Sequence, residues 1–212
     1  MESRKKARSK AKKRSTAKVE LINRKELEEL IDAGKRMYFS GLAAGSLGAI
    51  GVKLSSGKIA ITSRESCLGF LGADDLIVMN GRFPGDQKKT PPEEAGILFQ
   101  VLKKVPDCRA VLSLNSPYTM VLSHRKKREI EGAMPYMERL GGVSHVPYYR
   151  PGTAGLAGAV ASAMQKSNVV VVEGQGAIVR GATLREAIER AEALEAAAQV
   201  FYLLSGNGRT DG

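Results

Sequence analysis

The sequence predicts an α/β layered domain in which helices flank a central, mainly antiparallel β-sheet. Short apolar runs typical of buried strands alternate along the chain with longer segments whose apolar residues recur at helical spacing. A serine- and glycine-containing turn at 55–58 joins two of the apolar runs as a β-hairpin, whose strands must be antiparallel. A chain of 212 residues without a visible internal repeat can bury one substantial core, so we expect a single domain.

The first half of the domain is expected to begin with a helix and to continue as the hairpin. Asn23 is placed to cap that helix, and Glu26 stands three residues later in the capping-box position. Gly41 ends the helix and opens a glycine-rich turn. The strands expected next are 49–54, 58–62 and 76–79, and a second helix is expected at 93–104.

The second half is organised around a buried strand at 110–112 that leads into a loop of short polar side chains. The loop carries Ser113, Asn115 and Ser116, and Pro117 follows where its fixed φ suits the first turn of a helix. Side chains between the end of a strand and the start of a helix are well placed to line a site. The elements expected after the loop are helix 118–127, edge strand 146–149, helix 153–165, buried strand 169–172 and helix 183–204.

The net charge of +11 is concentrated at the N-terminus. Residues 1–18 hold nine Lys or Arg against one acid, Glu2, and so carry eight of the eleven net charges. Such a block of like charges cannot bury enough surface to fold alone. We expect a basic disordered tail at 1–22, the domain at 23–204 and a flexible C-terminal tail at 205–212. The basic tail is either a solvated arm or a non-specific contact to nucleic acid through residues 4–18.

The composition also argues against membrane and secreted classes. No run of eighteen apolar residues is present, and no apolar stretch follows the basic N-terminus as it would in a secretory signal. Cys67 and Cys108 form no recognisable framework, which is typical of a reduced setting, and Cys108 is expected to be a small core residue. The sequence therefore indicates a cytoplasmic protein that does not bind membranes.

Several segments, taken in order, resemble the class II aldolase/adducin family. Residues 113–117 (SLNSP) stand where the family carries His-x-His-Ser-Pro, and residues 174–176 (GQG) stand where it carries Asn-His-Gly. The other matching segments are 41–51, 59–63, 71–79, 90–94 and the helix at 183–204, so the resemblance covers about residues 25–204. It implies the family's fold, that of the L-fuculose-phosphate aldolase-like proteins, and a homo-oligomer, commonly a tetramer.

The resemblance also implies where the family's divalent metal, usually zinc, would be held. The three positions that carry histidine ligands in the family are Ser113, Asn115 and Gln175 in this chain. A hydroxyl and two amides offer neither a basic nitrogen lone pair nor a negative charge, so they do not suit zinc. The two histidines of the chain, His124 and His145, do not supply a three-imidazole site. We therefore expect no family zinc.

Glu94 matches the family's acid/base glutamate, with Glu93 as the competing register. A carboxylate buried in an apolar pocket would have a raised pKa and could transfer protons. The alternative is that Glu94 is only an acid in the first turn of a helix, favoured by the helix dipole.

The residues expected to bind a ligand are Ser46, Arg64, Ser113, Asn115 and Gln175. Positions that cradle phosphate in the family are altered here, because Pro92 removes a backbone donor and Glu93 adds a negative charge. The guanidinium of Arg64 either binds a small anionic ligand through its own fork or pairs with the adjacent Glu65.

These observations predict a class II aldolase/adducin-family domain that has lost its zinc site and works as a non-catalytic oligomeric scaffold or ligand-binding protein. The alternative is an aldolase-like lyase that acts on a small sugar phosphate or related carbonyl substrate through a non-histidine site, such as a lysine Schiff base or a metal held by carboxylates. A nucleic-acid binder acting through residues 4–18 is the third hypothesis.

Overall fold

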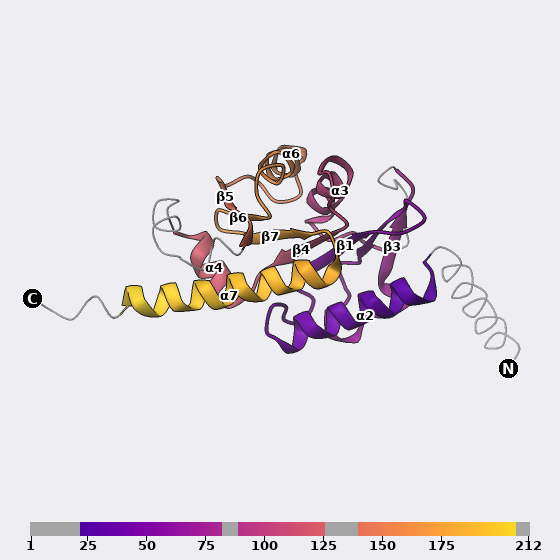
Figure 1. Ribbon diagram of the computed structural model, residues 1–212, viewed down its shortest axis with the longest axis horizontal. Helices are drawn as coiled ribbons and strands as arrows, with labels where there is room; N and C mark the ends of the chain where they lie inside the picture. The colour runs from indigo at the N-terminus through magenta and orange to yellow at the C-terminus, as the bar shows by residue number, and fades with distance from the viewer. Residues whose placement is uncertain (1–21, 82–88, 126–139, 207–212) are drawn as a thin grey trace, which may run out of the picture.

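The computed structural model describes residues 22–81, 89–125 and 140–206, which form a seven-stranded sheet with helices on both faces (Figure 1). The basic segment 4–18 lies outside the described residues, as do residues 126 and 127 of the helix expected at 118–127. Ile22, the last residue of the expected tail, is buried in the core at 4% exposure.

The sheet is mainly antiparallel, as the sequence predicts. Its strands run in the order β3-β2-β1-β4-β7-β6-β5. Each neighbouring pair is antiparallel except β5 and β6, which are parallel. The strands are β1 (Ala49–Lys53), β2 (Ile59–Thr62), β3 (Leu76–Met79), β4 (Ala110–Leu114), β5 (Val143–Val146), β6 (Val169–Val172) and β7 (Gly176–Gly181).

Helices α3 and α6 cover one face of the sheet, and α2, α4 and α7 cover the other (Figure 1). The helices are α2 (Arg24–Phe39), α3 (Ala95–Lys104), α4 (Pro117–Ser123), α6 (Ala154–Ala163) and α7 (Leu184–Gly206), with short 3₁₀ turns at Leu68–Phe70 and Ala73–Asp75. Both faces of β4 are buried, because Leu112 packs into one apolar cluster and Val111 into the other. Cys108 is also buried, as predicted.

The predicted cap of the first helix is confirmed, and the last helix is capped in the same way. The Oδ1 atom of Asn23 accepts the Glu26 N–H at 2.9 Å. At the start of α7, the Thr183 Oγ1 atom accepts the Glu186 N–H at 3.1 Å, and the Glu186 carboxylate accepts the Ala182 N–H at 2.6 Å. These side chains satisfy backbone donors that a helix leaves free at its N-terminus. Within the described residues, no helix has both the length and the apolar character needed to cross a membrane.

Several elements differ from the sequence prediction. Strand β4 runs to Leu114 rather than to Leu112, so Ser113 lies within the strand and not in the loop that follows it. The edge strand is 143–146 rather than 146–149, because Pro147 and the residues after it no longer pair with β6. Helix α4 ends at Ser123, four residues before the expected end. Strand β7 was not predicted at all: it begins and ends with glycine, a residue that is depleted in strands.

Candidate functional site

Four of the six predicted site residues line one cavity of about 130 Å³. They are Glu94, Ser113, Asn115 and Gln175, and we call this cavity the polar pocket. It opens at the C-terminal end of β4, beside the turn between β6 and β7 and the start of α3. Its remaining wall is formed by Glu93, Ile97, Met120, Pro151, Gly152, Val172, Gly174 and Ile178.

The sheet register brings these residues together from distant parts of the chain. Ser113 lies opposite Ala49 of β1 on one side and Ile178 of β7 on the other. The tight turn before β7 then carries Gln175 back over the end of β4. Gly176 has a φ of +87°, and a Cβ atom there would overlap the Leu114 carbonyl oxygen. A glycine is therefore required for this close approach.

The two amide side chains of the polar pocket donate to main-chain carbonyls. The Asn115 Nδ2 atom donates to the Gln175 carbonyl oxygen at 3.3 Å. The Gln175 Nε2 atom donates to the Tyr149 carbonyl oxygen at 2.7 Å. The two amides thus tie the β4–α4 loop, the β6–β7 turn and the segment after β5 to one another, while their carbonyl oxygens remain as acceptors.

Glu94 is the residue immediately before α3 and carries a perturbed carboxyl group. Burial raises the pKa of Glu94 above its ordinary value, and the negative charge of Glu93 raises this pKa further. The backbone amide and the positive charge of Arg64 oppose the shift without cancelling it. A carboxyl group with a raised pKa holds its proton at higher pH, so it can donate a hydrogen bond or a proton to a ligand oxygen.

Glu195 of α7 fixes the β4–α4 loop. One carboxylate oxygen accepts from the Ser116 hydroxyl at 2.7 Å, the Thr119 N–H at 2.8 Å and the Thr119 hydroxyl at 2.7 Å. The other accepts the Tyr118 N–H at 2.9 Å. The carboxylate therefore caps the N-terminus of α4 from a different helix. The sequence feature that could have revealed this role is the position of Glu195, which is an acid among the apolar residues on one side of helix 183–204.

Ser46 and Arg64 do not line the polar pocket. Ser46 is exposed in the glycine-rich turn. Arg64 pairs with the Glu93 carboxylate at 3.3 Å, so its partner is not the neighbouring Glu65 that the sequence suggested. The side chains of both Arg64 and Glu93 are about half exposed, at 49% and 58%. The guanidinium of Arg64 faces a separate cavity next to the polar pocket.

The donors of the polar pocket do not fit the zinc site that the family resemblance implies. They are one hydroxyl, two amides and the carboxyl groups of Glu93 and Glu94. His124 is exposed beside Gly174, and the Nε2 atom of His145 is buried with no hydrogen-bond partner among the residues that the structure describes. Within the described parts of the chain, no three His, Cys, Asp or Glu side chains gather in a way that would hold a metal ion.

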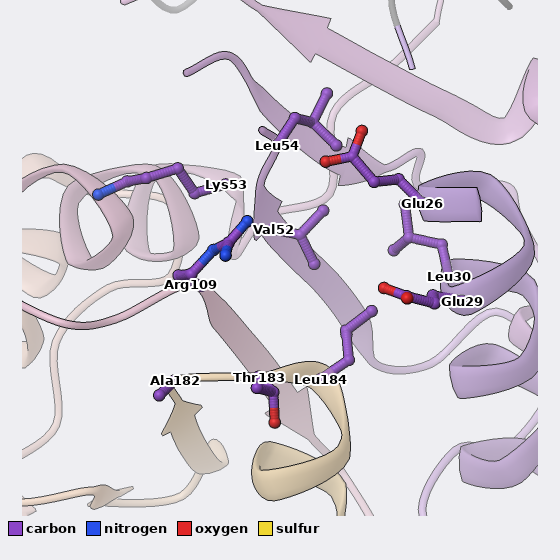
Figure 2. A pocket seen from close by; sticks show the side chains of 10 residues that line it. All are labelled: Glu26, Glu29, Leu30, Val52, Lys53, Leu54, Arg109, Ala182, Thr183 and Leu184. Carbon is purple, nitrogen blue, oxygen red and sulfur yellow. The ribbon is translucent and has the colours of Figure 1, made fainter. Parts of the chain in front are cut away.

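A different cleft of about 130 Å³ lies near the start of α2, between the end of β1 and the β7–α7 turn (Figure 2). Figure 2 shows Arg109 and Glu29 on opposite walls, with Leu30, Val52 and Leu184 among the apolar side chains around them. The nearby Glu26 carboxylate already accepts from Asn23 and from the Ser55 N–H. None of the predicted site residues lines this cleft. The polar pocket is therefore the stronger candidate.

Comparisons with known proteins find relatives over most of the chain. Residues 28–202 match the family described as the class II aldolase and adducin N-terminal domain. A 3-oxo-tetronate 4-phosphate decarboxylase of Haemophilus influenzae is 30% identical over 186 residues, covering 84% of this chain and 88% of the relative. The L-fuculose phosphate aldolase of that organism is 27% identical, covering 88% and 87%. The crystal structure of YgbL from Klebsiella pneumoniae superposes with a TM-score of 0.76 at 29% identity, covering 90% of this chain and 93% of YgbL.

Proposed function

The chain belongs to the class II aldolase and adducin N-terminal domain family, and we propose that it is a metal-independent, non-catalytic member that binds a small polyhydroxylated ligand in its polar pocket. One observation carries the proposal: Glu94, Ser113, Asn115 and Gln175 line a single cavity, although the three positions that the resemblance assigns to metal ligands hold no imidazole. We infer that the site keeps a pocket whose chemistry differs from that of the family's metal site.

The size and polarity of the pocket support a small ligand rich in hydroxyl groups. A cavity of about 130 Å³ has room for roughly four water-sized groups, given the share of liquid volume that one water occupies. The carbonyl oxygens of Asn115 and Gln175 accept hydrogen bonds, and the carboxyl of Glu94 donates one when protonated. Hydroxyl groups of a ligand both donate and accept, so they complement this mixture.

The contacts of the amide side chains argue against a zinc site. Asn115 and Gln175 donate to main-chain carbonyls and thereby brace the walls of the pocket. An amide in place of an imidazole offers zinc no basic nitrogen, and Ser113 offers only a neutral hydroxyl. We therefore propose that the family's zinc is not used in this chain.

Metal content and ligand binding test the proposal together. The full chain, purified without chelators and dialysed against zinc or manganese, should retain far less than one metal ion per chain by elemental mass spectrometry. Titration with erythritol should give a binding signal that Asn115→Leu and Gln175→Leu weaken. Stoichiometric zinc or manganese that is lost in Glu94→Ala would overturn the proposal, as would the absence of polyol binding to the wild-type chain.

A second candidate is a lyase that acts on a small sugar phosphate or a related carbonyl substrate. Two observations favour it: relatives are decarboxylases of 3-oxo-tetronate 4-phosphate, and the pKa of Glu94 is raised. In such a reaction the bond between the carboxylate carbon and the neighbouring carbon breaks, and CO₂ leaves. The electron pair of that bond stays on the substrate and forms an enolate, whose oxygen takes the proton of Glu94. CO₂ release from 3-oxo-tetronate 4-phosphate by the wild type, lost in Glu94→Gln, would establish the enzyme.

We also propose that the domain, expected at 23–204, forms homo-oligomers, with a tetramer as the state that the family resemblance implies. Large apolar side chains are exposed at several places on the surface, and such side chains mark contact surfaces when they gather. They include Phe39, Leu47, Phe70, Tyr148, Tyr202, Leu203 and Leu204. Light scattering after size-exclusion chromatography would give the mass directly, and a monomer at micromolar concentration would contradict the proposal.

The nucleic-acid hypothesis rests on residues 4–18, which lie outside the described residues. It predicts that affinity for a duplex of arbitrary sequence falls steeply with salt and disappears when residues 1–18 are deleted. Equal binding without these residues would reject it.

A further inference from the structure

The cleft near the start of α2 that Figure 2 shows carries no assigned role. We call it the α2 cleft and define it by Glu29, Leu30, Val52, Arg109, Ala182 and Leu184. It lies at the opposite end of β4 from the polar pocket, because Arg109 immediately precedes this strand and Asn115 immediately follows it. The two cavities share no lining residue.

Much of the lining of the α2 cleft is apolar. Leu30 and Val52 are buried residues of the core, and Leu184 packs against the same apolar cluster. Close packing with the core holds these side chains in place when no ligand is bound. An aliphatic group that covers them is removed from water, which favours binding.

Arg109 stands at one wall of the cleft in a fixed main-chain position. Its N–H donates to the Gly181 carbonyl oxygen at 3.0 Å, and its own carbonyl oxygen accepts the Lys53 N–H at 2.8 Å. Its guanidinium forms no hydrogen bond or ion pair with any residue that the structure describes. The N–H groups of the guanidinium are therefore available to a carboxylate, which they can bind through two parallel hydrogen bonds.

A carboxylate faces this guanidinium from α2. Figure 2 shows Glu29 on the wall opposite Arg109, whereas the Nζ atom of Lys53 points away from the cleft. The ion pair of Glu29 with Lys25 is long, at 3.9 Å, and both of these side chains are more than half exposed. Such a pair holds Glu29 only weakly. Glu29 and Arg109, both within the described residues, form no ion pair with each other across the cleft.

A second carboxylate on the α2 side has fixed partners. Glu26 accepts from the Asn23 Nδ2 atom at 2.7 Å and from the Ser55 N–H at 2.6 Å. Its negative charge adds to that of Glu29 at the same wall. A positively charged ligand group is therefore favoured beside α2, and a negatively charged group is favoured beside Arg109.

We propose that the α2 cleft binds a small amino acid with an aliphatic side chain, in its zwitterionic form. The carboxylate of the amino acid pairs with Arg109, its ammonium group pairs with Glu29, and its side chain covers Leu30, Val52 and Leu184. An amino acid carries opposite charges a few bonds apart, so it can bridge two protein groups that do not meet directly. This site does not depend on the function proposed for the polar pocket.

Three ligands that differ in their charged groups test the proposal. L-Valine carries both charges, isovalerate lacks the ammonium group, and isobutylamine lacks the carboxylate. Saturation-transfer NMR with the full chain should give a dissociation constant of about 1 mM for L-valine, because a ligand with so few heavy atoms binds weakly. Each analogue should bind roughly fivefold more weakly, since one exposed charged contact is lost. L-Valine that bound no more tightly than the two analogues would overturn the proposal.

Single-charge variants identify which protein group binds which ligand group. Arg109→Gln should weaken L-valine and isovalerate roughly fivefold and leave isobutylamine unchanged. Glu29→Gln should weaken L-valine and isobutylamine by a similar factor and leave isovalerate unchanged. Both side chains are exposed, so neither substitution should disturb folding. A variant that weakened all three ligands equally, or none of them, would contradict the assigned contacts.

Blocking the cleft provides the decisive comparison. Ala182 is exposed and lines the cleft, so Ala182→Trp should abolish L-valine binding. The substitution keeps the helix cap, because the Ala182 main-chain N–H is the group that donates to Glu186. Ala196→Trp, at an exposed position of α7 outside the cleft, is the matched control and should leave binding intact. Undiminished L-valine binding to Ala182→Trp would place the ligand elsewhere and refute the site.

Discussion

The Glu195 carboxylate on α7 and the Ser116 hydroxyl before α4 are 79 positions apart in the chain and 2.7 Å apart in space. The same carboxylate oxygen accepts two donors of Thr119, so three hydrogen bonds converge on it. Because Ser116 follows Asn115 directly, this contact fixes the loop that forms one wall of the polar pocket. The long C-terminal helix thus positions a site to which it contributes no lining residue.

Replacing Glu195 with Ala should therefore destabilise the fold by about 2 kcal/mol, since it removes a helix cap and leaves Ser116 and Thr119 donors without their acceptor. Urea unfolding of both proteins, monitored by circular dichroism, measures the difference. Glu189→Ala is the control, because Glu189 is on the same helix and forms an ion pair with Arg185 at the surface. Equal losses in the two variants would show that the buried cap has no special effect.

Glu94→Gln should stabilise the protein at neutral pH. The pKa of Glu94 is raised in the folded state, so the folded protein binds the proton more tightly than the unfolded chain. As pH rises through the window between the unfolded and folded pKa values, the wild type loses stability, and the loss is complete above the folded pKa. The neutral amide avoids this loss.

Unfolding curves across pH check the sign of this effect. The stability gap between Glu94→Gln and wild type should be greatest at neutral pH and should vanish once the solution is acidic enough to protonate Glu94 in both states. A gap that grows on acidification would mean that the folded state prefers the charged carboxylate.

Gly176→Ala should disturb the polar pocket more than glycine replacement at an open turn. Gly57 also has a positive φ, +78°, but an added Cβ there meets no atom of the described residues within 4 Å. Gly57→Ala should cost about 1 kcal/mol from the unfavourable φ alone. Gly176→Ala adds the overlap with the Leu114 carbonyl and should cost about 3 kcal/mol. Thermal unfolding of the pair isolates the steric part, and equal costs would contradict the close approach.

Much of the fold was predictable because local patterns and caps agree with the tertiary structure. Asn23 precedes an amphipathic helix and caps it as its spacing predicts, and Thr183 caps the last helix with the same spacing. Strand β7 escaped prediction because its flanking glycines, Gly176 and Gly181, are there for close backbone approach. A glycine that is needed for close packing does not indicate a strand in the sequence. For this reason β7, one of the two neighbours of β4 in the sheet, was not predicted.

Part of the lining of the polar pocket was predictable from the sequence, but the contacts of its side chains were not. The resemblance selected Ser113, Asn115 and Gln175, which do line one cavity. No local pattern, however, indicates that Arg64 reaches across to Glu93 rather than to its neighbour Glu65. Such pairings depend on how loops meet in three dimensions.

Restoring imidazoles at Ser113, Asn115 and Gln175 tests whether this cavity still has the shape of the family's metal site. The triple variant Ser113→His, Asn115→His, Gln175→His would bring three neutral nitrogen donors and the Glu94 carboxylate to one cavity, a donor set that suits zinc. We expect one zinc ion per chain by elemental mass spectrometry, with a dissociation constant of about 1 μM or below. The wild-type chain should take up none under the same conditions.

The double variant that keeps Gln175 is the matched control. It supplies two imidazoles instead of three, so its zinc affinity should fall well below that of the triple variant, and removing Glu94 from the triple variant should weaken zinc further. Circular dichroism must first establish that each variant is folded. A folded triple variant that binds no zinc would mean that the three positions no longer converge at metal-binding distance, and the change in this pocket would then lie in its backbone as well as in its side chains.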